Sequence, residues 1–103
     1  MNIEYYPEDK LKKEIMQIIR KHLDADRYKV FFFGSRVKGD NFIHADIDIG
    51  IEGDEPIPAS SKLEIIDELD NLPTLYRIDF IDFKVVSDKF KNEALKYSER
   101  IDT

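Results

Sequence analysis

In residues 46–51 of this chain, Asp-Ile-Asp-Ile-Gly-Ile, isoleucine occupies every second position. Strict alternation is typical of a half-buried strand, because successive side chains of a strand point to opposite faces. The isoleucines then share the buried face, and Asp46 and Asp48 lie side by side on the other. Upstream, the near-continuous apolar run of residues 28–33 ends at Gly34 and predicts a buried strand. The pattern therefore predicts two strands, of which the second carries paired carboxylates.

Paired carboxylates and a glycine turn favour chemistry on phosphates. Like charges this close resist joint ionisation unless a cation lies between them. Mg²⁺ commonly takes one or two carboxylates and completes its shell with water and substrate phosphates. Gly34 lets a phosphate approach the backbone, and residues 34–40 predict a tight turn and a short helix whose N-terminus, near Ser35, favours an anion. These features predict a site for phosphoryl or nucleotidyl transfer.

The order and spacing of the two motifs resemble those of a known superfamily. Residues 34–39, Gly-Ser-Arg-Val-Lys-Gly, followed by residues 46–49, Asp-Ile-Asp-Ile, are similar to the signature of the DNA polymerase β-type nucleotidyltransferases. The length and acidic character of the chain resemble those of the smallest branch, the minimal nucleotidyltransferase (MNT) domain proteins.

The resemblance implies a role for each motif. Gly34 and Ser35 would bind the nucleotide triphosphate, ATP. Asp46 and Asp48 would bind the catalytic metal ions, expected to be two Mg²⁺. A third acidic residue on a later strand would complete the metal-binding set.

Four residues near the motifs are less specific. We expect Arg36 to assist in nucleotide binding, because it directly follows the Gly-Ser pair. Lys38 and His44 are more simply explained as exposed residues of a short helix and a loop. The family commonly has Ser immediately before its first Asp, and this chain has Ala45 there.

Two acids compete for the third position. Residues 76–83 predict a strand, on which Asp79 and Asp82 point to opposite faces. The apolar pattern alone does not choose between them. The resemblance favours Asp79, which matches the first Asp of the family pattern, and leaves Asp82 as a strand-end or structural acid.

Three longer helices are predicted from apolar spacing. The first opens at Pro7 and ends near Leu23, with His22 as a capping or surface residue of its last turn. The second covers residues 59–71, with an acidic solvated face and three inward residues, Leu63, Ile66 and Leu69. The last is capped by Ser87 or Asp88, and its expected apolar face consists of Phe90, Ala94, Tyr97 and Ile101.

These elements predict an α/β (α+β) fold. The resemblance implies the nucleotidyltransferase arrangement, a small mixed sheet of about three strands flanked by about four helices. At 103 residues, the chain is expected to form a single minimal nucleotidyltransferase domain over residues 1–103.

Composition narrows the function classes. Without cysteine, disulfides and thiolate metal sites are excluded. A net charge of −6 argues against non-specific nucleic-acid binding. No apolar run is long enough to span a membrane and the N-terminus is too charged for a signal peptide, so we expect a cytoplasmic protein.

The resemblance also implies a partner. The chain offers little material to enclose an acceptor, and MNT relatives act with a separate all-helical protein of the HEPN or substrate-binding type, often as antitoxin and toxin. The leading interpretation is transfer of AMP from ATP to such a protein. A non-catalytic module that neutralises a helical partner by contact is the alternative. A small-molecule adenylyltransferase whose acceptor pocket comes from a second subunit is a third interpretation, and a homo-oligomer is left open.

Overall fold

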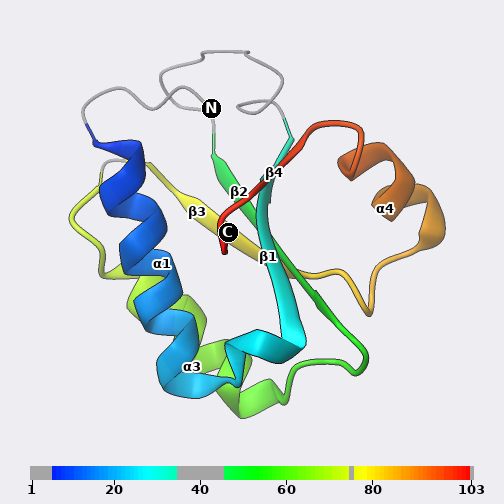
Figure 1. Ribbon diagram of the computed structural model, residues 1–103, viewed down its shortest axis with the longest axis horizontal. Coiled ribbons are helices and arrows are strands. Elements are labelled where there is room, and N and C mark those ends of the chain that lie inside the picture. The colour runs from blue at the N-terminus through cyan, green and yellow to red at the C-terminus, as the bar shows by residue number, and fades with distance from the viewer. Residues whose placement is uncertain (1–5, 35–45, 75, 103) are drawn as a thin grey trace.

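A four-stranded mixed sheet forms the centre of the molecule (Figure 1). The computed structural model describes residues 6–34, 46–74 and 76–102. The strands are β1 (Tyr28–Phe33), β2 (Ile47–Gly53), β3 (Ile78–Asp82) and β4 (Ser98–Arg100), in the spatial order β3-β2-β1-β4. β2 runs antiparallel to β1 and parallel to β3, and β4 pairs antiparallel with β1. The predicted mixed sheet is confirmed, with one strand more than expected.

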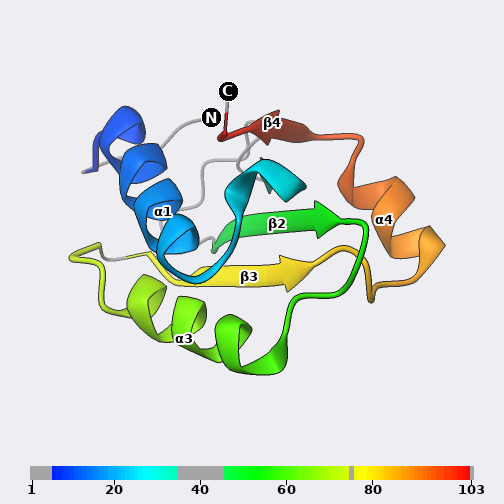
Figure 2. The ribbon, with the colours of Figure 1, turned by 60° about the horizontal axis from the view of Figure 1, so that its bottom comes forward.

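Helices cover the two faces of this sheet unequally (Figures 1 and 2). The chain forms α1 (Glu8–His22), the 3₁₀ turn η1 (Ala25–Arg27), α3 (Ala59–Asp70) and α4 (Asp88–Ala94). α1 and α3 pack together on one face, and the shorter α4 lies on the other. In the part of the chain that the structure describes, no helix has the length and apolar character to cross a bilayer.

The period-two pattern of the strands divides the core into two clusters. The larger cluster lies under α1 and α3 and contains the strand residues Val30, Phe32, Ile47, Ile49, Ile51, Ile78 and Phe80. The smaller cluster lies under α4, where the Phe31 and Phe33 rings meet Phe83 edge-on at centroid distances of 4.8 and 5.0 Å. Glycine at position 50 makes room for these rings, because a Cβ there would lie 2.4 Å from Phe31. At position 50 of β2, where a side chain would point to the α4 face, the rings of Phe31 and Phe83 therefore occupy the space.

The inward face of α3 differs from the prediction. Ile65 and Leu69 are buried, whereas Leu63 points to solvent. Ile65 and Leu69 are four residues apart and share a face of the helix, and Leu63 lies two residues from Ile65, on the far side. Ile66 packs at the margin of the core. The prediction was wrong for Leu63, because the sequence does not distinguish an exposed leucine from a buried one.

The C-terminal segment also differs from the prediction. The Ser87 hydroxyl caps α4 as expected, accepting a hydrogen bond from Phe90 N at 3.1 Å. However, the helix ends at Ala94, and the chain turns back into β4. Ile101 N donates to Val30 O at 2.8 Å, and the Ile101 side chain is buried in the larger core cluster. This segment therefore pairs with the free edge of β1 as a strand, although its apolar residues have helical spacing.

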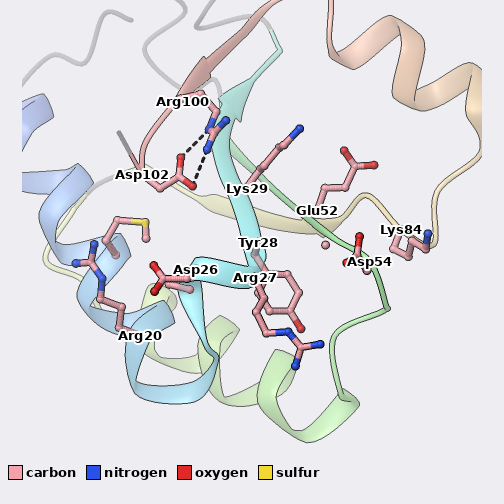
Figure 3. A pocket seen from close by; sticks show the side chains of 13 residues that line it. Arg20, Asp26, Arg27, Tyr28, Lys29, Glu52, Asp54, Lys84, Arg100 and Asp102 are labelled. Carbon is pink, nitrogen blue, oxygen red and sulfur yellow. Dashed lines mark hydrogen bonds and ion pairs between the residues drawn. The ribbon is translucent and has the colours of Figure 1, made fainter.

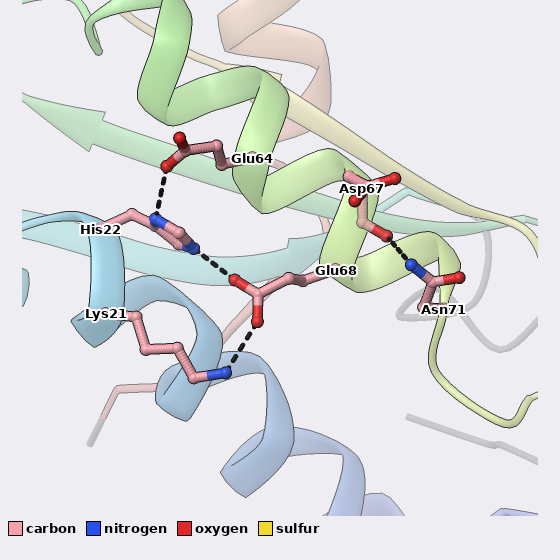
Figure 4. A network of polar contacts seen from close by, with 6 residues as sticks. All are labelled: Lys21, His22, Glu64, Asp67, Glu68 and Asn71. Atoms are coloured by element: carbon pink, nitrogen blue, oxygen red, sulfur yellow. Dashed lines mark hydrogen bonds and ion pairs between the residues drawn. The ribbon is translucent and has the colours of Figure 1, made fainter.

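A polar network joins α1 to α3 (Figure 4). His22 is half-buried, with Nδ1 2.9 Å from Glu64 and Nε2 in contact with Glu68. Lys21 Nζ donates to the second Glu68 oxygen at 2.7 Å. Hydrogen bonds from Lys21 and then His22 hold the pKa of Glu68 below its usual value. Two acids predicted to be merely solvated therefore connect the helices, and the capping role of His22 was wrong.

Candidate active site

The pairing register brings two predicted site residues side by side. Asp48 of β2 lies directly opposite Asp79 of β3 in the parallel pair, and Phe33 of β1 lies opposite Asp48 on the other side. Residues in one row across a sheet point to the same face. This row lies on the face that α4 covers only partly, away from α1 and α3. Asp46, two residues before Asp48, shares that face, and its carboxyl hydrogen-bonds to Asp79.

The three carboxyl groups disturb one another's protonation. Burial, followed by the charges of Asp79 and Asp46, raises the pKa of Asp48 to about 6. Burial and a hydrogen bond that the protonated Asp79 carboxyl donates to Asp46 also raise the pKa of Asp79, against the opposing charge of Arg77. The anionic forms are disfavoured because the negative charges are crowded and partly desolvated. This is the arrangement that a bound cation relieves.

A glycine is required beside this cluster. Gly34 follows β1 directly and adopts a positive φ of 88°, a region that L-residues with side chains rarely occupy. A Cβ at this position would lie 2.7 Å from Asp48 Oδ2. The Gly34 N–H is held by the Tyr97 carbonyl at 3.1 Å. The backbone at Gly34 therefore lies so close to the Asp48 carboxylate that any side chain at this position would clash with it.

The other predicted nucleotide-binding residues, Ser35 and Arg36, lie outside the described residues, as do Lys38, His44 and Ala45. Their roles stay predictions from the motif.

Asp82 occupies a different environment from Asp79. Only 4% of its surface is exposed, on the sheet face that α1 and α3 cover. Its two carboxylate oxygens accept hydrogen bonds from Ile57 N and Lys84 N, both at 2.9 Å. Asp82 thus fastens the loop before α3 and the turn after β3. The geometry supports Asp79 as the acid beside Asp48.

Sequence reasoning missed one charged neighbour of the cluster. Arg77 Nε lies 3.5 Å from Asp79 Oδ1, and the Arg77 side chain is largely exposed. Its position two residues before Asp79 on the same strand face was the available signal. Arg77 partly neutralises the carboxyl cluster.

The chemistry of these donors fits a hard divalent cation. Carboxylate oxygens are the ligands that Mg²⁺ prefers. No three His, Cys, Asp or Glu side chains within residues 6–34, 46–74 and 76–102 are already arranged around a metal position. Asp46 and Asp79 are instead close enough for the protonated Asp79 carboxyl to donate a hydrogen bond to Asp46. The three acids are gathered in one place, but their side chains are not arranged around a common metal position.

A recess of about 610 Å³ lies elsewhere, where η1 leads into β1 (Figure 3). Side chains of both charges line it, among them Arg20, Asp26, Arg27, Lys29 and Asp54. An ion pair between Arg100 and Asp102, at 2.6 Å, spans one side. None of the three clustered carboxylates lines this recess. It is separate from the candidate active site.

Comparison with known proteins agrees with this geometry. The family described as "Polymerase beta, Nucleotidyltransferase" matches residues 10–102. The chain therefore belongs to the polymerase β nucleotidyltransferase family, whose members use a nucleotide substrate and usually a divalent metal ion.

Two similar proteins narrow the branch. The chain is 34% identical over 94 residues to "Putative protein adenylyltransferase MJ1379" of Methanocaldococcus jannaschii, covering 84% of this chain and 93% of that protein. It is 28% identical over 83 residues to "Probable protein adenylyltransferase MntA" of Haemophilus influenzae, covering 79% and 73%. The prediction of a minimal nucleotidyltransferase domain protein is confirmed.

Solved structures share the fold. A toxin–antitoxin crystallised with AMP-PNP superposes with a TM-score of 0.71 at 16% identity, over 87% of this chain and 71% of that one. A complex of a tri-AMPylated Shewanella oneidensis HEPN toxin with an MNT antitoxin gives a TM-score of 0.63 at 16% identity, over 90% and 71%. The likeness confirms the predicted nucleotidyltransferase fold.

Proposed function

We propose that this protein transfers AMP from ATP to a hydroxyl group of a HEPN-type helical partner, and so acts as the antitoxin of a toxin–antitoxin pair. The observation that carries the proposal is the row in which Asp48 lies beside Asp79, with Asp46 bonded to Asp79. The names of the two similar adenylyltransferases support AMP transfer to protein. The complex of an MNT antitoxin with an AMPylated HEPN toxin supports the class of partner.

Each acid has a proposed role. Asp46, Asp48 and Asp79 would together hold two Mg²⁺ ions, which neutralise the charge of the triphosphate and of the departing pyrophosphate when bound. Asp79 would also accept the proton of the attacking hydroxyl, since it lies beside Asp48 on the sheet face that an acceptor would reach. Arg77, close to Asp79, would add a positive charge beside the reacting phosphate group.

The other end of the site would bind the triphosphate. Gly34 has no side chain that would press on Asp48 or obstruct a phosphate, so the triphosphate could lie close to the backbone here. Ser35 and Arg36 follow directly and would contribute a hydroxyl and a guanidinium. All these residues belong to the proposed single nucleotidyltransferase domain.

The test is a transfer assay with purified proteins. A HEPN-type protein from the same genome is incubated with this protein, Mg²⁺ and ATP labelled on its α-phosphate. We expect label on the partner, and its loss in Asp46→Asn. Asp26→Asn is the matched control, since Asp24 and Asp26 form a second Asp-x-Asp triplet outside the site. Inhibition of the partner without any transfer would instead support a non-catalytic binding module.

A further inference from the structure

Exposed apolar side chains are concentrated in one segment of the chain. The described residues include five large hydrophobic side chains that are substantially exposed. They are Val85 at 62%, Phe90 at 42%, Leu95 at 38%, Tyr97 at 45% and Leu63 at 68%. Four of the five lie within residues 84–97, which we call the α4 segment. Scattered exposed apolar residues are ordinary, but four within one segment of fourteen residues make that segment a candidate interaction surface.

The α4 segment adjoins the candidate active site. The Phe90 ring lies 6.1 Å from the Phe33 ring, and Phe33 is the direct neighbour of Asp48 in the sheet. At the other end of the segment, the Tyr97 carbonyl accepts the Gly34 N–H. The segment therefore touches the sheet next to the carboxylate row, at Phe33 and Gly34.

The charge of the segment is opposite to that of the whole protein. The α4 segment contains four lysines and two acids, whereas the chain has a net charge of −6. Lys91 pairs with Glu52, and Lys96 pairs with Glu93. Within the described part of the chain, Lys84 and Lys89 form no ion pair. A complementary surface would present apolar side chains bordered by acids.

The direction of approach of an acceptor is also limited. Its hydroxyl must reach Asp48 and Asp79, which point to the α4 face of the sheet. The opposite face is covered by α1 and α3. A protein acceptor that reaches the carboxylates from this side must rest on its neighbouring surface.

We propose that the α4 segment is the docking surface for the protein acceptor, which contacts it through an apolar helical face edged by acidic side chains. This inference rests on the proposed function, since it takes the acceptor to be a protein. Docking here would hold the acceptor hydroxyl beside the carboxylate row. Contacts far from the reacting atoms would then help to orient the hydroxyl for transfer.

The experiment compares two sets of substitutions in the full chain. Val85→Ser with Leu95→Ser removes two exposed apolar contacts of the α4 segment. Leu63→Ser removes one of the same kind on α3, on the opposite side of the sheet. Affinity for a purified HEPN-type protein of the same genome is measured by calorimetry. Thermal melts and nucleotide binding check that each variant is folded and retains its site.

We expect the double variant to bind the partner about tenfold or more weakly, because two apolar side chains would no longer be removed from water on binding. Leu63→Ser should bind like the wild type. In the wild-type complex, amide hydrogen exchange should slow across residues 84–97 and not across α3. Equal affinity of the double variant, equal weakening by Leu63→Ser, or absence of binding would overturn the inference.

The outcome is separable from that of the proposed function. Wild-type protein that binds the partner through residues 84–97 but transfers no AMP supports the docking surface and refutes AMP transfer. If the purified protein alone is a dimer that the double variant dissociates, the segment is a self-association surface and the docking proposal is wrong.

Discussion

Asp79 and Asp82 lie three residues apart on β3, and replacing each with asparagine separates a role in chemistry from a role in stability. Asp82 is almost fully buried and accepts two backbone hydrogen bonds at 2.9 Å. Asparagine retains one acceptor oxygen and turns an amide NH₂ toward the other N–H. Loss of one hydrogen bond to a charged group, with its donor left unpaired, costs about 2–3 kcal/mol. For a domain of this size that lowers Tm by roughly 10–20 °C.

Asp79→Asn should behave in the opposite way. Its carboxylate is disfavoured in the folded protein by burial and by Asp46. A neutral side chain of the same shape therefore keeps Tm close to that of the wild type or raises it. AMP transfer, however, should fall by about a hundredfold or more, because the proposed metal ligand and proton acceptor would be lost.

Both variants are measured by urea or thermal unfolding, and transfer is assayed well below the lower Tm. Asp82→Asn should transfer normally per folded molecule. If Asp82→Asn abolishes transfer while remaining folded, the assignment of the third carboxylate is wrong. Normal transfer by Asp79→Asn would have the same consequence.

Three further predictions follow from the site and the helix contact. Gly34→Ala forces a Cβ to within 2.7 Å of Asp48 Oδ2, on a backbone with a φ of 88°. We expect the unfolding free energy, measured by melts, to fall by about 1–3 kcal/mol. The KM for ATP, measured by steady-state kinetics, should rise. Asp46→Asn and Asp48→Asn should each reduce transfer by about a hundredfold or more without lowering Tm in EDTA; unchanged transfer in both would exclude a metal role. The pKa of Glu68 is lowered by Lys21 first, so its stabilising effect is present above the ordinary value of 4.5 and disappears as pH falls through the lower folded value. Glu68→Gln should therefore lower Tm at neutral pH and match the wild type near pH 3, and a difference that persists in acid would contradict this account.

Much of the site could be predicted because it depends on local periodicity. Alternation of Asp and Ile in residues 46–51 determines which face each side chain takes, and the structure places Asp46 and Asp48 together as expected. The alternative between Asp79 and Asp82 was not decidable in this way, since either parity was compatible with an apolar neighbourhood. The register, which places Asp79 opposite Asp48, favours Asp79, and register depends on contacts between distant segments.

The errors share a physical cause. The segment after Ala94 has helical apolar spacing. In the structure it instead forms β4, because the free edge of β1 has backbone groups that a strand can pair with and a helix cannot. His22 looked like a surface residue because its partners, Glu64 and Glu68, lie more than forty residues away. Local patterns contain no information about which distant element completes a surface.

The late position of β4 has a consequence for biosynthesis. A growing chain can pair β1 with β2 once Gly53 has emerged from the ribosome, but the carbonyl of Tyr97 that holds Gly34 is added more than forty residues later. Folding begins in segments that emerge first, and contacts between remote segments form later. The glycine beside the carboxylates therefore gains its anchor only after nearly all of the sheet exists. A nascent chain stalled before residue 97 would carry every acid of the cluster, yet it would lack the hydrogen bond that fixes the neighbouring backbone.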